Sequence, residues 1–208
     1  MPDKSTVHII DDDDAVRQSL EFLLKSAKLD VRSHDSASSF LEALPNLGLG
    51  CVITDVRMPG LSGIDLLKRL KTEANSIPVI VITGHGDVPL AVEAMKCGAA
   101  DFLEKPFDDE LLLSTVRSAL NRLKKDGKRE AERAEILDGL AALSNRERQV
   151  LEGLVAGDSN KVIAFNLTIS PRTVEIYRAN VMSKMASASL SDLVRKALIV
   201  GMLDNSPV

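Results

Sequence analysis

The sequence predicts a doubly wound α/β domain followed by a second domain built only from helices. Over residues 1–122, short apolar runs alternate with segments of helical periodicity. A segment crowded with charges follows, and between residues 143 and 203 the apolar positions recur only at helical spacing. Strands that alternate with helices form a parallel sheet with helices on both faces. We therefore expect an α/β domain at 1–122, a charged linker at 123–142 and an all-α domain at 143–208.

Four apolar runs are candidates for buried parallel strands, and each ends in polar residues. The runs are VHII at 7–10, CVIT at 51–54, VIVI at 79–82 and FL at 102–103. Ligands of doubly wound sheets bind outside the carboxyl ends of the strands. We expect the polar residues at these ends to meet in one crevice, and they are Asp11, Asp12, Asp55, Thr83 and Lys105.

Helices with one apolar face separate these runs. Their apolar residues recur three and four positions apart, which is the period of an α-helix. Gly98 is a candidate helix end, because glycine readily adopts the left-handed conformation found there. The apolar faces consist of Val16, Leu20, Leu23, Leu24 and Ala27; of Leu66, Leu67 and Leu70; of Ala91, Ala94 and Met95; and of Leu111, Leu112, Thr115, Val116 and Leu120.

The composition indicates aliphatic cores and a reducing compartment. The chain has 208 residues, 45% of them hydrophobic, only 3% aromatic and none of them Trp. This length suffices for two ordinary domains. Cys51 and Cys97 show no paired spacing and are expected to be reduced thiols. We find no signal stretch at the start and no apolar run near the ~20 residues of a membrane span, so we expect a cytoplasmic protein.

Charge is distributed unevenly along the chain. Residues 1–124 carry 14 Lys and Arg against 19 Asp and Glu, a net charge of −5, whereas residues 125–208 carry 12 against 11, a net charge of +1. The difference points toward a nucleic-acid partner for the C-terminal part, although strong binders are usually more basic. Residues 121–135 hold ten charged side chains in fifteen positions, which indicates a linker. Gly127 would cost a continuing helix roughly 1 kcal/mol.

The C-terminal part predicts four helices. Ser144 and Glu147 fit a capping box, and Ser170 precedes Pro171, which suits the first position of a helix. Residues 159–184 therefore have the pattern of a helix, a short turn and a second helix. The apolar positions of the other helices are Val150, Leu151, Leu154 and Val155; Val162, Ile163 and Phe165; and Leu190, Leu193, Val194, Ala197 and Leu198.

The strand-end residues predict a site that accepts a phosphoryl group. This chemistry needs a nucleophilic carboxylate, a divalent metal and cations for the phosphoryl oxygens. Mg²⁺ prefers oxygen ligands and uses few protein carboxylates. We expect Asp12 and Asp55 to bind Mg²⁺ directly, Asp11 to bind it through water, and the backbone carbonyl of Arg57 to complete the protein ligands.

Two further residues suit the phosphoryl oxygens. Lys105 can supply a positive charge and Thr83 a hydroxyl donor. The Lys105–Pro106 bond is a candidate cis peptide, which would aim the lysine into the crevice.

Each of these residues also has an ordinary explanation. The acidic run 11–14 can be a solvated turn in which Asp14 caps a helix, and Asp55 can initiate a turn. Thr83 and Lys105 can be a plain strand residue and an exposed charge. Their joint occurrence at successive strand ends favours a site. The three histidines, His8, His34 and His85, lie in different elements, so we do not expect them to bind a metal.

The helix that begins at Pro171 has a candidate DNA-reading face. Val174, Tyr177 and Val181 form its core stripe, and the opposite face can enter the major groove. Glu175 can accept a hydrogen bond from cytosine, and Ile176 can contact a thymine methyl group. From the pattern alone, a four-helix packing module with a solvated face remains an alternative. The candidate DNA-contacting residues are Lys161, Arg172, Thr173, Glu175, Ile176, Arg178, Ala179, Asn180 and Lys184.

On these residues the chain resembles the FixJ-type two-component response regulators. Residues 1–122 are similar to their receiver domain, a flavodoxin-like fold with five parallel strands, and residues 143–203 to the LuxR/NarL-type helix-turn-helix domain. The resemblance implies that Asp55 is the phosphorylated aspartate and that Asp11 and Asp12 are the metal-binding acid pair. It further implies that Thr83 and Lys105 contact the phosphoryl group and that Phe102 is the switch aromatic.

The resemblance also implies partners and a mode of control. The phosphodonor would be a sensor histidine kinase of the FixL type, with Mg²⁺ as cofactor. Phosphorylation would drive formation of a homodimer and binding to duplex DNA, with RNA polymerase as a further candidate partner. The controlled genes would be those of nitrogen fixation or micro-oxic growth. Thr168 departs from the family, which usually has Gly in this turn.

Two other functions remain open. The protein can be a phosphorylation-dependent adaptor that binds other proteins. It can also be a metal-dependent phosphatase of the haloacid-dehalogenase kind. The phosphatase needs its nucleophile in an Asp-x-Asp run on the first strand, which residues 11–14 fit poorly. We therefore expect a regulator and not an enzyme.

Overall fold

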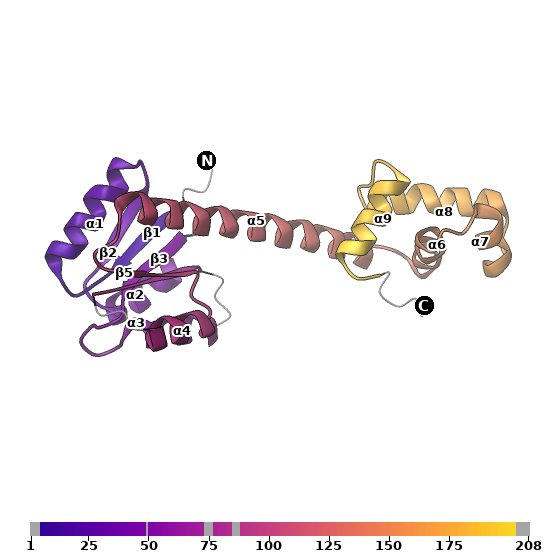
Figure 1. Cartoon of the computed structure of the whole chain (residues 1–208). Coiled ribbons are helices and arrows are strands. Elements are labelled where there is room, and N and C mark those ends of the chain that lie inside the picture. Colours follow the sequence, from indigo (N-terminus) through magenta and orange to yellow (C-terminus); the bar gives the residue numbers. More distant parts are fainter. Residues whose placement is uncertain (1–4, 49, 73–76, 85–87, 203–208) are drawn as a thin grey trace. The chain divides into compact units, whose positions relative to one another are not determined.

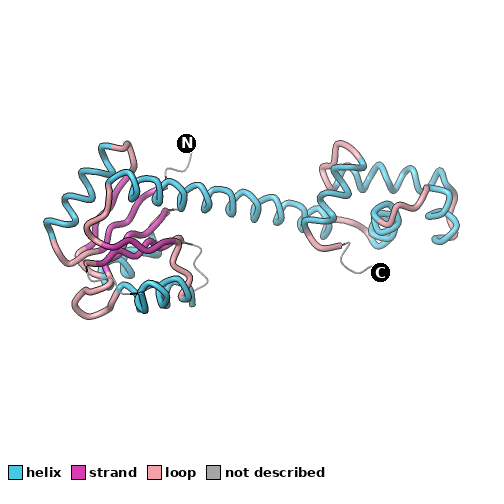
Figure 2. The backbone as a smooth tube through the Cα atoms, viewed as in Figure 1, coloured by secondary structure: helices cyan, strands magenta, loops and turns pink. Residues whose placement is uncertain are grey.

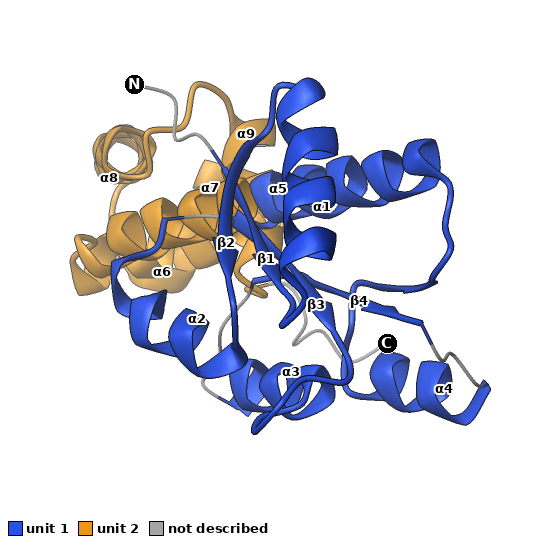
Figure 3. Ribbon diagram, turned by 90° about the vertical axis from the view of Figure 1, so that its left-hand side faces the viewer, with its two compact units in different colours: residues 1–126 blue, residues 127–208 orange. Residues whose placement is uncertain are grey.

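The computed structural model describes residues 5–48, 50–72, 77–84 and 88–202. The chain divides into two compact units, residues 1–126 and residues 127–208 (Figure 3). Helix α5 spans Asp109–Ala141 and therefore contributes residues to both units. Although α5 is 33 residues long, it is strongly charged, and no helix in the described ranges combines the length and the apolar character needed to cross a membrane.

The first unit is a parallel sheet between two layers of helices (Figures 1 and 2). Its five strands lie in the order β2-β1-β3-β4-β5, and each pairs in parallel with its neighbours. This confirms the predicted fold class. The elements before α5 are β1 (Thr6–Ile10), α1 (Asp14–Ser26), β2 (Asp30–His34), α2 (Ala37–Ala43), the 3-10 helix η1 (Leu44–Asn46), β3 (Gly50–Asp55), α3 (Gly63–Thr72), β4 (Val79–Thr83), α4 (Val88–Lys96) and β5 (Asp101–Glu104).

Two apolar clusters fill the space on either side of the sheet. One joins the sheet to α2, α3 and α4, and the other joins it to α1 and the first part of α5 (Figure 3). Strands β3 and β4 are buried at every position, because helices cover both of their faces. The register pairs Ile10 with Thr54 and Asp55 with Ile82, so the polar ends of β1, β3 and β4 lie at the same edge of the sheet.

The second unit consists of the C-terminal part of α5 and four shorter helices. Serine side chains accept hydrogen bonds from backbone N–H groups at all four of their starts, and Ser144 with Glu147 forms the predicted capping box. Thr168 ends the second of them in the left-handed conformation, at φ 56°. The helices are α6 (Asn145–Val155), α7 (Asn160–Leu167), α8 (Pro171–Lys184) and α9 (Leu190–Ile199).

The C-terminal end of the predicted linker, residues 123–142, packs into the second unit. Ile136 and Leu140 of α5 are buried in the apolar cluster of the second unit, together with residues of α6, α7, α8 and α9. Arg133 donates to the carbonyl of Ile199 at 2.8 Å, and Glu132 pairs with Arg195 of α9 at 2.6 Å. The core of the second unit therefore begins before residue 143.

Candidate functional site

Asp11, Asp55 and Lys105 meet at the carboxyl edge of the sheet, as the strand ends predict. Lys105 Nζ lies 3.0 Å from Asp11 Oδ2 and 2.9 Å from Asp55 Oδ1. The side chains of Asp11 and Asp55 are only 3% and 11% exposed, and that of Lys105 is 25% exposed. One ammonium group thus bridges two carboxylates that are almost removed from water.

Each carboxylate is also held by a backbone amide. The second oxygen of Asp55 accepts from the N–H of Arg57 at 2.6 Å, and Asp11 Oδ1 accepts from the N–H of Asp13 at 2.9 Å. Burial opposes the charge on Lys105, but its hydrogen bonds to Asp55 and Asp11 prevail and raise its pKa. The Lys105 ammonium therefore remains charged between the two carboxylates.

Thr83 and Phe102 lie on the neighbouring strands. Thr83 is buried at the end of β4, and its register partner on β5 is Glu104. Phe102 is partly buried and packs against the apolar cluster on the side of α3 and α4. The Lys105–Pro106 bond is cis, which confirms that prediction.

The donor set of this site suits a hard cation such as Mg²⁺. Asp11 and Asp55 present only oxygen atoms, and Mg²⁺ commonly binds one or two carboxylates and completes its octahedron with other oxygens and water. Across the described ranges, no three His, Cys, Asp or Glu side chains are grouped closely enough to hold a metal ion. Asp12 is exposed. The structure thus brings together two of the three acids predicted to bind the metal, and the role of Asp12 stays a prediction.

His8 and His34 lie in different strands, as expected, but the fold brings them together. His8 Nδ1 is 3.3 Å from His34 Nε2, and both rings pack edge-on against Phe40. His8 Nε2 has no hydrogen-bond partner among the described residues. Burial, with the charges of His34 and Arg32, lowers the pKa of His8 to about 4. His85 lies outside the described residues.

The face of α8 predicted to read DNA is open. Arg172, Glu175, Ala179 and Asn180 are exposed, and the apolar side chain of Ile176 is 57% exposed. The buried side of the helix consists of Val174 and Val181, with Tyr177 partly buried against the same core.

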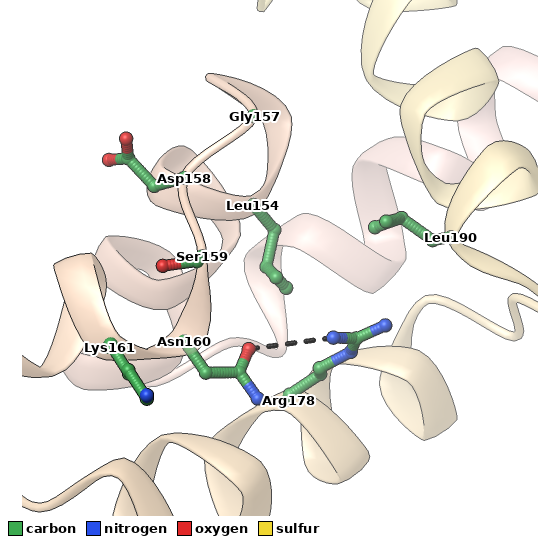
Figure 4. A pocket seen from close by; sticks show the side chains of 8 residues that line it. All are labelled: Leu154, Gly157, Asp158, Ser159, Asn160, Lys161, Arg178 and Leu190. Carbon is green, nitrogen blue, oxygen red and sulfur yellow. Dashed lines mark hydrogen bonds between the residues drawn. The ribbon is translucent and has the colours of Figure 1, made fainter.

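Two other candidate DNA-contacting residues border a cavity of about 460 Å³ in the second unit. Figure 4 shows Arg178 of α8 reaching toward Asn160 at the start of α7, where Nη1 lies 3.4 Å from Asn160 Oδ1. Lys161 is exposed beside Asn160. Arg178 is half-buried and already engaged, whereas Lys161 is available to a partner.

Lys184 and Thr173 are occupied by contacts within the unit. Lys184 Nζ lies 2.7 Å from Glu147 Oε2 and donates to the carbonyl of Ala142 at 3.1 Å. The hydrogen bonds from Lys184 and from the backbone of Ser144 lower the pKa of Glu147 to about 2. The hydroxyl of Thr173 lies 2.8 Å from that of Ser170. The predicted DNA contact of Lys184 thus competes with a structural ion pair.

Two contacts that hold these sites were not foreseen from the sequence. One is the Glu147–Lys184 ion pair, which joins residues 37 positions apart. The other is a hydrogen bond from Arg17 to the backbone of Asp11. The capping box signalled Glu147, but neither partner could be identified without the tertiary structure.

Comparison with known proteins covers nearly the whole chain. The family described as "Response regulator receiver domain" matches residues 7–117, and the family described as "Bacterial regulatory proteins, luxR family" matches residues 141–197. The chain is 60% identical over 201 residues to the transcriptional regulatory protein FixJ of Azorhizobium caulinodans, covering 97% of this chain and 95% of that protein. It is 56% identical over 205 residues to FixJ of Bradyrhizobium diazoefficiens, covering 99% and 100%.

Solved structures of two response regulators are also similar to this chain. Full-length FixJ from B. japonicum is 57% identical, with a TM-score of 0.61, and the match covers 97% of this chain and 99% of that one. The response regulator StyR is 39% identical, with a TM-score of 0.84, and the match covers 94% and 98%.

Proposed function

The chain belongs to the FixJ-like response regulators, which join a receiver domain to a LuxR-family DNA-binding domain, and on that premise we propose that Asp55 accepts the activating phosphoryl group. The observation that supports this most is the bridge of Lys105 between Asp55 and Asp11 at the carboxyl edge of the sheet. It places a buried nucleophile beside a fixed cation, which phosphoryl transfer needs.

The transfer proceeds in one displacement. A carboxylate oxygen of Asp55 attacks phosphorus, the phosphorus–nitrogen bond of a phosphohistidine breaks, and an acyl phosphate remains on Asp55. The donor would be a sensor histidine kinase of the FixL type. Lys105, which now donates to Asp55, would donate to a phosphoryl oxygen instead, and the backbone N–H of Arg57 keeps the carboxylate oriented.

Mg²⁺ would be held by Asp11, Asp12, Asp55 and the backbone carbonyl of Arg57. When bound, it neutralises the charge on the phosphoryl oxygens. Because Lys105 already donates to both buried carboxylates, bound Mg²⁺ would share these two side chains with the ammonium.

The acyl phosphate would act as a switch. Its phosphoryl group carries about −1.5 to −2 charges in a pocket that already holds acids. Thr83 would turn its hydroxyl toward the phosphoryl group, and Phe102 would repack into the space that this movement opens.

A homodimer is the proposed product of the switch. Four large apolar side chains of α4 and the first turn of α5 are 44–77% exposed, which is a costly arrangement on an isolated receiver. Pairing of two chains would cover them and offer two DNA-binding domains to one duplex, which raises affinity by effective concentration. The four side chains are Val88, Val92, Met95 and Leu111.

Duplex DNA would be read by α8. Its exposed residues face the major groove in this proposal, and Lys161 contacts a phosphate. RNA polymerase is a further candidate partner. The resemblance to FixJ suggests genes of nitrogen fixation or micro-oxic growth as targets.

The assignment of Asp55 is tested by phosphorylation in vitro. Purified protein is treated with a small phosphodonor and Mg²⁺, and the modified residue is located by mass spectrometry after borohydride reduction. We expect one modified aspartate, Asp55, and none in Asp55→Asn. Modification of another acid, or equal modification of the variant, would refute the assignment. Lys68→Met, which changes an exposed ion pair with Glu93, serves as control.

A further inference from the structure

Arg17 of α1 connects the first helix to the acidic loop that follows β1. Its Nη1 donates to the backbone carbonyl of Asp11 at 2.6 Å, and its Nη2 forms an ion pair with Asp14. The side chain of Arg17 is only 14% exposed, whereas that of Asp14 is 79% exposed. The guanidinium group therefore lies against the protein and not in solvent.

Arg17 completes the hydrogen bonding of Asp11 by donating to its backbone carbonyl. The N–H of Asp11 donates to the carbonyl of His34 at 3.3 Å, and its carbonyl accepts from Arg17. One carboxylate oxygen accepts from the N–H of Asp13 and the other from Lys105. Both backbone groups and both carboxylate oxygens of Asp11 are thus engaged.

We propose that Arg17 is a positioning residue of the phosphorylation site, which holds the loop of Asp11 and Asp12 in the conformation that binds Mg²⁺. The proposal rests on the proposed function, since it assumes that these acids bind the metal. Arg17 touches none of the reacting atoms and acts through the backbone of Asp11. Groups that orient metal ligands in this way typically alter metal affinity about 10- to 100-fold when removed.

The charge of Arg17 alone has the opposite effect. A guanidinium group beside the acids at residues 11–14 lowers the negative potential that attracts Mg²⁺. Removal of this charge would therefore strengthen metal binding if the loop kept its conformation. Loss of the hydrogen bond to Asp11 would weaken binding. Weaker Mg²⁺ binding after removal of Arg17 thus indicates a positioning role, and tighter binding indicates that only its charge matters.

The test is the Mg²⁺ affinity of the unphosphorylated full-length protein, measured by calorimetry. We expect Arg17→Met to weaken Mg²⁺ binding about 10-fold or more. Arg17→Lys should fall between that variant and the wild type, because an ammonium can reach one acceptor but lacks the guanidinium fork. Lys25→Met removes a cation from the same helix, 57% exposed and paired with Glu21, and should leave the affinity within about 2-fold.

A kinetic measurement supports the equilibrium one. The Mg²⁺ concentration for half-maximal phosphorylation of Arg17→Met should rise, while the rate at saturating Mg²⁺ stays close to that of the wild type. Equal or tighter Mg²⁺ binding by Arg17→Met with a native circular dichroism spectrum would overturn the proposal. If that variant does not fold, wild-type affinity in Arg17→Lys overturns it. A wild-type protein that binds no Mg²⁺ would instead overturn the proposed function.

Discussion

The two units hold their candidate functional residues in opposite ways. In the first unit, Asp11, Asp55 and Lys105 are largely buried, and each is fixed by hydrogen bonds to named partners. In the second unit, the candidate residues on the open face of α8, such as Arg172 and Ile176, are exposed to solvent. Phosphoryl chemistry needs charges fixed before the donor arrives. A helix that reads DNA needs a fixed backbone, but its exposed side chains find their hydrogen-bond partners on the DNA.

Lys184 is the informative exception. It belongs to the candidate DNA-contacting residues and is 38% exposed, yet it forms an ion pair with the buried carboxylate of Glu147 at 2.7 Å. Buried ion pairs that lose one partner leave an uncompensated charge behind. We therefore expect Lys184 to position α8 and not to bind phosphate.

Removal of Lys105 should have the largest effect. Lys105→Met leaves two carboxylates side by side without a cation, and unsatisfied buried groups cost about 1–3 kcal/mol each. Without Mg²⁺, the free energy of unfolding of the first unit should fall by about 1–3 kcal/mol for each carboxylate left unsatisfied. With Mg²⁺ bound, it should return toward the wild-type value. Denaturant titrations with and without the metal check this, with the exposed Lys28→Met as control. An unchanged free energy under both conditions would contradict the bridge.

Lys184 and Arg172 should respond differently to salt. Arg172→Met should reduce the dependence of log affinity on log salt concentration by about 0.9, because one phosphate contact is lost. Lys184→Met should weaken binding to every duplex but leave this dependence unchanged. Fluorescence anisotropy on one duplex at several salt concentrations measures both. A reduced salt dependence for Lys184→Met would show that it contacts phosphate.

Ile176 should affect sequence preference and little else. Its exposed side chain suits a thymine methyl group, and such base contacts contribute on the order of 1–3 kcal/mol of discrimination. Ile176→Ser should weaken binding to the preferred duplex toward the lower end of that range and leave binding to random DNA unchanged. Competition between the two duplexes measures the ratio. Equal losses on both would place Ile176 outside the base-reading face.

Lowering the pH should reduce the stability of the two units in different pH ranges. The pKa of His8 falls from 6.5 to about 4 on folding, so the unfolded chain binds the proton first and stability is lost as pH falls from about 6.5 toward 4. The pKa of Glu147 falls from 4.5 to about 2, so its contribution is lost only as pH falls from about 4.5 toward 2. Hydrogen exchange should therefore accelerate in β1 before α6.

His8→Leu supplies the control for this order. In this variant, hydrogen exchange in β1 should no longer accelerate as the pH falls from about 6.5 toward 4. Exchange in α6 should still accelerate as the pH falls from about 4.5 toward 2. Acceleration of both elements in the same pH range would contradict the assignment of the two groups. At neutral pH, where neither group changes its protonation, we expect the smallest difference between variant and wild type.

The predictable features of this protein depended on local signals. Apolar runs and their polar ends located the strands, and the register then brought Asp55 and Lys105 together. Ser144 and Glu147 located the start of α6 from four consecutive residues. The contacts of Arg17, His8 and Lys184 depend on which elements become neighbours, and no local pattern carries that information.

The linker is another segment whose contacts cannot be predicted from local patterns. Ile136 and Leu140 are isolated apolar residues in a charged segment, and their burial follows only from the helices that surround them. Composition alone therefore does not reveal that this part of the segment contributes to the core of the second unit. Asp12 is exposed, and its role as a metal ligand stays a prediction from its place in the acidic run.

The central claim is that one buried acid of the receiver controls DNA binding by α8. Its most direct test is the affinity of the full-length protein for its preferred duplex, obtained by capture from genomic DNA, before and after treatment with a phosphodonor and Mg²⁺. We predict that the wild type binds at least about 10-fold more tightly after treatment, a coupling of about 1.4 kcal/mol, and that Asp55→Asn does not change. Equal affinities of the treated and untreated wild type, or the same gain in Asp55→Asn, would contradict the account.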